Sequence, residues 1–252
     1  MVGDKDSTAA TQVSSRGMTW SIIARDAASG AFGVAIATRF FAAGALCPHA
    51  SSGVGALSTQ ALVNPHYGPQ GLALLRAGVA APEVVKRLVA PDDGREQRQL
   101  HVIDAQARIA QHTGAQCLEW CGALAGDGYS VAGNMLANER VIRETARAYE
   151  GSRERPFAER LIAALQAGEA AGGDKRGKQS AALLVYASEE YPELDLRVDD
   201  HAEPLAELQR LHDKAHERFV PFMRCAPSKA RPAGELDRAR IEEAIARYRR
   251  AT

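Results

Sequence analysis

The chain has 252 residues, of which 46% are apolar, and this is enough for the core of one large domain. Its formal net charge of zero excludes the basic surface of a typical nucleic-acid-binding protein, and no apolar run approaches the ~20 residues of a membrane-spanning helix. Four cysteines are too few for a disulfide-stabilised scaffold of this length. We therefore expect neither nucleic acid nor membrane among its partners.

The N-terminal region combines a polar leader with a buried hairpin. Residues 1–17 lack the apolar segment of a secretory signal, which predicts a disordered leader or extension and a cytoplasmic location. From Met18 to Arg39, apolar residues alternate on both sides of a turn at Asp26–Gly30, which predicts a β-hairpin. Thr19 follows a Met at the start of this hairpin. An N-terminal nucleophile enzyme needs such a residue, because its α-amine and hydroxyl can act as base and nucleophile.

The middle of the chain alternates between strands and pairs of helices. The predicted strands cover residues 54–59, 99–103, 108–112, 129–133 and 180–187. The predicted helices cover residues 71–77, 82–89, 138–149 and 156–167. Residues 40–49 and 59–68 are predicted loops, and the Gly- and Ala-rich residues 114–128 predict short strands with a loop. This order favours stacked layers of sheet and helix over a doubly wound nucleotide-binding fold.

The composition becomes strongly charged after residue 194. Two amphipathic helices are predicted, at Pro204–Phe219 and Glu235–Arg249, and we expect them to pack on a main domain of residues 18–194. Residues 195–252 carry more apolar surface than one thin layer would bury. This predicts a homodimer or higher homo-oligomer with a contact near Pro204–Phe219.

Several long motifs carry a family resemblance from about Thr19 to about Leu211. In chain order they are Thr-Trp-Ser-Ile-Ile-Ala-Arg-Asp, Gly-Val-Gly-Ala-Leu-Ser-Thr-Gln, Gln-His-Thr-Gly, Gly-Asn-Met-Leu, Gly-Gly-Asp-Lys-Arg-Gly-Lys-Gln-Ser-Ala and Arg-Val-Asp-Asp-His. Together they resemble the family catalogued as domain of unknown function 1028. The resemblance implies an N-terminal-nucleophile (Ntn) hydrolase-like fold, which is an α+β, four-layer αββα sandwich of two antiparallel sheets between helices. Members usually begin at the equivalent of Met18, so residues 1–17 depart from the pattern.

A broader likeness to Ntn hydrolases implies four catalytic roles. Thr19 would be the nucleophile, and Thr59 and Gln60 would end the third strand with backbone amides that hold an oxyanion. Asp174, in the turn after Gly172-Gly173, would support the α-amine. Proteasome subunits carry an acidic residue at the end of the second strand, where this chain has Thr38-Arg39, and this departure puts a proteasome-like proton relay in doubt.

Other polar residues follow predicted strands or occupy loops, where substrate-binding residues concentrate. The predicted substrate-binding residues are Arg39, Ser58, Asn64, His66, His112, Asn134, Arg176 and Ser180. Arg176 can hold a carboxylate with its guanidinium fork, so if it faces the site we expect a substrate or product that bears a carboxylate. The residues that we expect around Thr19 are Ser58, Thr59, Asn134, Asp174 and Ser180. For each of these residues, an ordinary turn, cap or solvated side chain is the alternative.

The residues leave three functions open. The first is an amidohydrolase that cleaves a small polar or carboxylate-bearing amide through Thr19. The second is a non-catalytic binding module of the same fold, for a small ligand or a protein partner. The third is a metal-dependent hydrolase that uses His212 with His216, one helical turn apart, or the cluster Asp199-Asp200-His201. A solvated helix face explains the histidines better, and Cys117 and Cys121 lack a zinc-site spacing, so we expect no metal and no cofactor.

Overall fold

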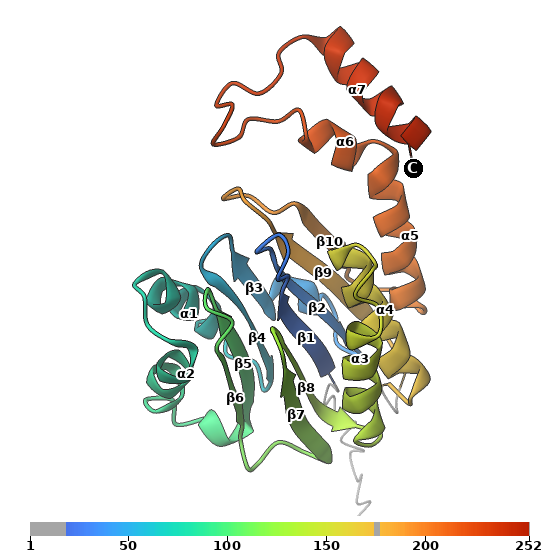
Figure 1. Cartoon of the computed structure of the whole chain (residues 1–252). Helices are drawn as coiled ribbons and strands as arrows, with labels where there is room; N and C mark the ends of the chain where they lie inside the picture. The colour runs from blue at the N-terminus through green and yellow to red at the C-terminus, as the bar shows by residue number, and fades with distance from the viewer. Residues whose placement is uncertain (1–18, 174–176, 252) are drawn as a thin grey trace, which may run out of the picture.

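The computed structural model describes residues 19–173 and 177–251, which form two antiparallel sheets packed face to face (Figure 1). The six-stranded sheet has the order β10-β9-β2-β1-β8-β7 and the four-stranded sheet has the order β3-β4-β5-β6. The first sheet contains β1 (Thr19–Arg25), β2 (Phe32–Thr38), β7 (Trp120–Gly126), β8 (Tyr129–Leu136), β9 (Ser180–Tyr186) and β10 (Leu194–Val198). The second contains β3 (Pro48–Ser51), β4 (Gly55–Ala61), β5 (Arg98–Asp104) and β6 (Ile109–Thr113).

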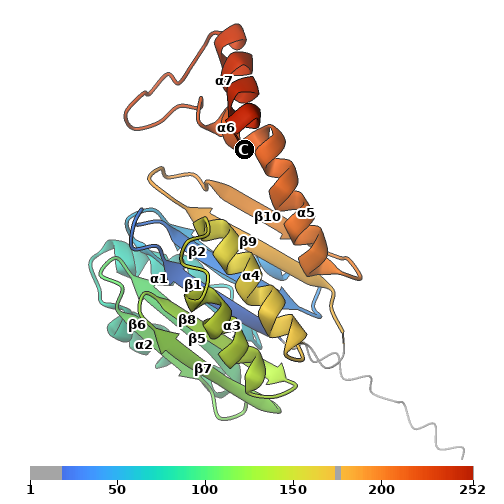
Figure 2. The same cartoon turned by 45° about the vertical axis from the view of Figure 1, so that its right-hand side comes forward.

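Helices cover the outer face of each sheet (Figures 1 and 2). The four-stranded sheet packs against α1 (Tyr67–Arg76) and α2 (Ala81–Val89). The six-stranded sheet packs against α3 (Arg140–Glu150), α4 (Phe157–Ala170) and α5 (Pro204–Glu217). The layer order is therefore helix, sheet, sheet, helix, which confirms the predicted α+β αββα sandwich.

The central strand β1 presents two different buried faces. Trp20, Ile22 and Ala24 face the helices α3 and α4 and belong to the largest apolar core. Trp20 lies so close to α4 that a Cβ at Gly168 would come within 2.8 Å of its Nε1 atom. Thr19 and Ser21 point the other way, because successive side chains of a strand alternate between faces. They therefore lie between the two sheets.

Several elements differ from the sequence prediction. β3 begins with Pro48, inside the predicted loop at residues 40–49, and lies at the edge of the four-stranded sheet, where the missing N–H of a proline is tolerated. The Gly- and Ala-rich segment forms one seven-residue strand, β7. The predicted domain boundary at residue 194 falls at the start of β10, which pairs with β9. The six-stranded sheet therefore extends to Val198, since β10 forms its edge strand.

The last helices form an extension that we call the C-terminal arm, residues 219–251. It contains α6 (Phe219–Met223) and α7 (Arg238–Ala251), which project beyond the sandwich (Figures 1 and 2). An ion pair joins Arg218 to Glu242, and the Arg224 guanidinium lies 4.7 Å from the centroid of the Tyr248 ring. Thus α5 packs on the sheet, whereas α7 packs on α5 and α6. No helix in the described ranges is long and apolar enough to cross a membrane.

Candidate functional site

A cavity of about 580 Å³ opens where strands of both sheets end. Thr19 at the start of β1, Gln60 and Ala61 at the end of β4, and Asn134 and Met135 near the end of β8 all line it. Its volume lies within the range of small-molecule sites. The strand ends thus place the predicted nucleophile in a cavity of suitable size.

Thr19 is the centre of a polar row across the six-stranded sheet. The strand register pairs Thr19 with Thr38 on one side and with Asn134 on the other, and it pairs Thr38 with Ser180. The Thr19 and Thr38 hydroxyl oxygens are 2.9 Å apart and hydrogen-bonded. Ser180 donates to the Phe40 carbonyl at 2.6 Å. Thr19 is only 6% exposed, so its hydroxyl is held in a protected position.

The described part of the cavity wall contains no carboxylate, histidine or lysine. Its titratable side chains are two thiols. Burial raises the pKa of Cys47 to about 12, and burial followed by the nearby Cys121 raises the pKa of Cys117. Both thiols are therefore protonated at neutral pH. The described side chains offer no general base to the Thr19 hydroxyl.

Behind the cavity, hydrogen-bonded side chains fill the space between the sheets. We call Ser21, Gln60, Gln99, His101, Ser130 and Asn134 the inter-sheet network. Ser21 donates to Gln60 Oε1 at 2.6 Å, so the His101 Nε2 atom, 2.9 Å from Ser21 Oγ, must carry the proton of that ring. His101 Nδ1 then accepts from Ser130 at 2.9 Å. Burial lowers the pKa of His101 to about 3, which agrees with this neutral form.

Gln99 fixes the orientation of two cavity residues. Its Oε1 atom accepts from Gln60 Nε2 at 2.8 Å and from Asn134 Nδ2 at 3.0 Å. Its Nε2 atom donates to Thr113 Oγ1 and to the carbonyls of Gly122 and Gly133. A flipped Asn134 amide would place its oxygen against the Gln99 oxygen, so the flip is excluded. The buried Asn134 Oδ1 atom has no hydrogen-bond partner among the described residues.

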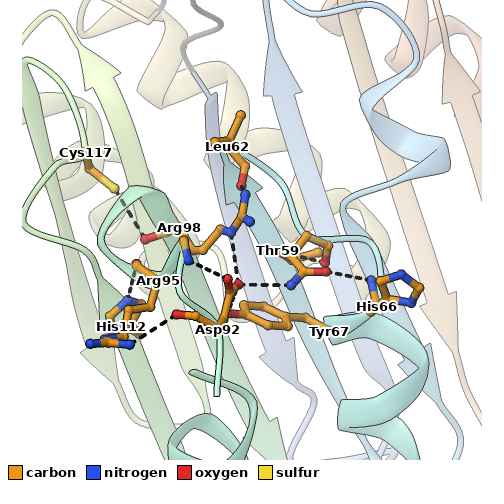
Figure 3. Close-up of polar contacts among 11 residues, drawn as sticks. Thr59, Leu62, His66, Tyr67, Asp92, Arg95, Arg98, His112 and Cys117 are labelled. Atoms are coloured by element: carbon orange, nitrogen blue, oxygen red, sulfur yellow. Dashed lines mark hydrogen bonds and ion pairs between the residues drawn. The ribbon is translucent and has the colours of Figure 1, made fainter. Parts of the chain in front are cut away.

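A second polar cluster, centred on Asp92 and Arg98, holds the outer rim of the cavity (Figure 3). Arg98 donates to Asp92 Oδ2 at 3.1 Å and to the carbonyl of Leu62, a cavity residue. The Cys117 thiol donates to the Arg98 carbonyl at 3.3 Å. The hydrogen bond from Tyr67 at 2.7 Å, followed by one from Arg98, holds the pKa of Asp92 far below its usual value. Asp92 is therefore an anion that ties together distant rim segments.

The model of a family of unknown function, DUF1028, matches residues 19–208. The chain belongs to the DUF1028 family. Protein SPO2555 from Silicibacter pomeroyi, a solved DUF1028 structure, is 30% identical, with a TM-score of 0.81 over 87% of this chain and 100% of that chain. Anbu (ancestral beta-subunit) from Yersinia bercovieri is 13% identical, with a TM-score of 0.37 over 83% of this chain and 98% of that chain. No curated protein matches the sequence significantly.

Within this DUF1028 chain, the structure brings some predicted site residues to the cavity. Thr19, Gln60 and Asn134 line it, and Ser180 lies one strand beyond Thr38 in the same row. Ser58 is buried behind Gln60 and donates to its Oε1 atom at 3.4 Å. Their roles in catalysis or substrate binding stay predictions.

Thr59 requires a correction. Its backbone N–H already donates to the Cys47 carbonyl at 3.1 Å, because β4 pairs with the segment that leads into β3. This amide is not free for an oxyanion. Its hydroxyl donates to the Asn64 carbonyl at 3.3 Å, which makes Thr59 a support for the following loop.

Asn64 and His66 form the loop that we predicted to face the substrate, but neither lines the cavity. Asn64 Nδ2 donates to Asp92 Oδ2, and Asn64 Oδ1 accepts from the His66 amide. Both polar atoms of Asn64 are thus used to shape the loop and to attach it to the Asp92 cluster. The exposed His66 precedes α1.

The remaining predicted site residues lie elsewhere. His112 donates from Nε2 to the Arg95 carbonyl at 2.8 Å, and Arg39 is exposed at the end of β2; neither lines the cavity. Asp174 and Arg176 lie outside the described residues. Their proposed contacts with the α-amine and with a carboxylate therefore stay predictions.

Sequence reasoning missed Gln97, Gln99 and Gln116. Gln97 and Gln116 line the cavity, and Gln99 lies directly behind it. Gln99 and His101 alternate with apolar residues in β5, so two polar residues on one strand face were a usable signal. Gln97 and Gln116 belong to no sequence motif that would have indicated a role in the site.

Unusual backbone conformations also gather at the cavity. Five described residues other than glycine have positive φ, and Ala61 and Met135 among them line the cavity. Ala42 and Glu119 directly adjoin the lining residues Ala43 and Leu118. Strained backbone concentrates at functional sites more than elsewhere, which fits this location.

The histidines considered as metal ligands pack instead. The His212 and His216 rings are 4.5 Å apart between centroids, and His216 Nδ1 bonds to the His212 carbonyl. Burial, followed by the charge of His216, lowers the pKa of His212. Among the described residues, no three His, Cys, Asp or Glu side chains are grouped to hold a metal ion.

Proposed function

We propose that this protein is an N-terminal-nucleophile amidohydrolase that cleaves an amide bond in a small polar or carboxylate-bearing substrate through Thr19. One observation carries the proposal. The Thr19 hydroxyl lies at the first position of β1 in a substrate-sized cavity whose described wall supplies no other base. In an N-terminal nucleophile, the base is the α-amine of the same residue, so this arrangement suits that mechanism.

The proposed reaction needs a free α-amine at Thr19. An amide nitrogen does not accept a proton, whereas an α-amine with a pKa of roughly 7.7–8.0 does so near neutral pH. The amine takes the hydroxyl proton as Oγ1 attacks the substrate carbonyl, and it returns a proton to the departing amine. Water then hydrolyses the acyl ester and regenerates the hydroxyl. Residues before Thr19 must therefore be absent from the active form, either because translation starts at Met18 and Met18 is removed, or by self-cleavage.

Intact-mass analysis of the protein from its native start, paired with hydrolysis of a panel of small amides, tests the proposal. We expect active protein to begin at Thr19. Thr19→Ala should abolish turnover, Thr19→Ser should keep part of it because the hydroxyl survives, and the exposed Ser29→Ala should match wild type. A fully active chain that still carries residues before Thr19 would rule out this mechanism.

A non-catalytic binding module is the second candidate. The inter-sheet network favours this function, because its side chains hydrogen-bond to one another and order the cavity without relaying a proton to Thr19. The described wall of the cavity is also uncharged. Such a module would bind its ligand equally well with or without residues before Thr19. Ligand binding without turnover by a chain that begins at Thr19 would favour this function.

We also propose that the protein forms a homodimer or higher homo-oligomer through its C-terminal region. Phe219, Phe222 and Leu236 of the C-terminal arm are 45%, 44% and 80% exposed, which leaves apolar surface available for a contact. We expect light scattering at tens of micromolar to show an oligomer, since association follows mass action. The double variant Phe219→Ser/Phe222→Ser should dissociate it, whereas Phe41→Ser, which is exposed outside the arm, should not. A monomeric wild type contradicts the proposal.

A further inference from the structure

The chemistry of the cavity wall indicates what kind of ligand it accepts. The fifteen described residues that line it are uncharged, and they include four carboxamides: Gln60, Gln97, Gln116 and Asn134. Placing a carboxylate against these side chains removes it from water without a compensating cation, which is unfavourable. The Thr19 α-amine of the proposed function does not supply that cation, because it acts as a base only in its neutral form. The described wall therefore disfavours the anionic group expected from Arg176.

Two of the carboxamides offer both a donor and an acceptor to a ligand, whereas Asn134 offers only its Oδ1 acceptor. Gln60 uses its side chain in the inter-sheet network, where it accepts from Ser21 and donates to Gln99 and to the Ala132 carbonyl. By contrast, the exposed side chains of Gln97 and Gln116 make no hydrogen bond to the described residues. Each presents a donor and an acceptor on the cavity wall. A carboxamide pairs most completely with another amide, which also offers both.

The segments that carry Gln97 and Gln116 are fixed to each other. Gln116 N–H donates to the Glu96 carbonyl at 2.7 Å, and Gly114 N–H donates to the Arg98 carbonyl at 2.9 Å. The Ala115 amide donates to the Glu96 carboxylate at 3.0 Å. Arg98 also joins this rim to Asp92 and to the Leu62 carbonyl (Figure 3). The two free carboxamides thus project from a rim that is already ordered, which lowers the entropy cost of binding.

Exposed apolar side chains also line the same cavity. Phe40, Leu62 and Leu118 line it and are all more than two-fifths exposed, and Phe41 follows Phe40. Large exposed apolar side chains rimmed by polar groups are typical of ligand-binding surfaces. An apolar substituent on the ligand would cover them.

We infer that the cavity selects a neutral amide that bears an apolar side chain, with Gln97 and Gln116 binding the amide and Phe40, Leu62 and Leu118 covering the apolar part. This inference rests on the proposed function for the reaction at Thr19, whereas the binding of the neutral amide does not depend on that reaction. The inferred substrate is therefore an uncharged amide and not a carboxylate-bearing one. Specificity then comes from amide pairing and from the exclusion of charge.

Calorimetric titration of the full chain, as wild type and as Thr19→Ala, tests the inference with two matched probes. N-acetyl-leucinamide and N-acetyl-leucine have nearly the same size, and only the second carries a carboxylate at pH 7. We expect the Kd of the neutral probe to be lower by about tenfold or more. Gln97→Met and Gln116→Met keep the volume but remove the carboxamide, so each should weaken the neutral probe by about three- to tenfold, as expected for one hydrogen bond.

Gln70→Met serves as the control, because Gln70 is an exposed α1 residue outside the cavity with no side-chain hydrogen bond to the described residues. It should leave both Kd values unchanged. The inference is overturned if the carboxylate probe binds as tightly as the neutral probe or more tightly, or if neither probe binds. It is also overturned if neither glutamine substitution changes the Kd of the neutral probe. Selective binding by a wild type that begins at Thr19 and hydrolyses no amide would instead remove the proposed catalysis and leave the inference standing.

Discussion

The two faces of β1 are equally buried but chemically different. Trp20 and Ile22 face the helices and lie among apolar side chains, whereas Thr19 and Ser21 face the four-stranded sheet and lie among hydroxyls, carboxamides and an imidazole. An apolar face is stabilised by the area that it removes from water. A polar face must satisfy each donor and acceptor, and this fixes the side chains individually. The difference shows where the strand supports the fold and where it supports a site.

Trp20→Ala should produce the largest loss of stability, because it empties the apolar face. Removing a fully buried aromatic side chain costs about 3–5 kcal/mol of the free energy of unfolding. Urea denaturation would measure it, with the smaller Ile22→Val change, expected to cost about 0.5–1.5 kcal/mol, as control. A loss below that of Ile22→Val would contradict the role of Trp20 as the main residue of this face.

Gln99→Leu should break the polar face. It removes the acceptor of Gln60 and Asn134, and a buried donor without a partner costs about 1–3 kcal/mol. Gln60 Nε2 keeps the Ala132 carbonyl as a second acceptor, so its cost is near the lower limit and we expect a total loss of about 2–4 kcal/mol. It should also weaken ligand binding, since both donors line the cavity. The exposed Gln106→Leu is the matched control and should change stability by less than about 0.5 kcal/mol. Equal effects of the two substitutions would show that the network is not organised by Gln99.

The polar face should also respond to pH through His101. Its pKa of about 3 lies below the unfolded value near 6.5, so the unfolded chain binds the proton more readily. Its stabilising contribution is complete above pH 6.5 and falls as the pH drops toward 3, by about 2 kcal/mol between pH 7 and pH 5. His49 and His212, whose pKa values are also lowered by burial, add to the same slope. The difference in unfolding free energy between wild type and His101→Gln isolates the contribution of His101. This difference should decrease by about 2 kcal/mol when the pH is lowered from 7 to 5.

Thr113→Val should give the smallest effect. Gln99 Nε2 donates to Thr113 Oγ1 but also to two backbone carbonyls, so the loss of one acceptor leaves the donor satisfied. We expect less than about 1 kcal/mol in urea denaturation. A cost as large as that of Gln99→Leu would mean that the three acceptors are not interchangeable.

The layers and much of the polar row could be predicted from local sequence patterns. Alternation in β1 and β2 places Thr19 and Thr38 at strand ends, and Asn134 and Ser180 follow from their positions in β8 and β9. The rim could not be predicted in this way. Gln97 and Gln116 line the same cavity because Arg98 and Glu96 hydrogen-bond to a segment that follows β6, and such contacts between loops leave no periodic signal. Asn64 was misjudged because its partner, Asp92, lies 28 residues away.

The left-handed backbone at Ala61 and Met135 has a consequence for protein engineering. An L-residue there costs roughly 1–2 kcal/mol, whereas glycine adopts this conformation freely but loses roughly 0.5–1 kcal/mol through its more flexible unfolded chain. Ala61→Gly would thus bring a small net gain in melting temperature, because it relaxes the backbone beside the cavity. The same relaxation loosens the wall that a ligand must fit. A laboratory search for heat-resistant variants would therefore select against tight binding at this position.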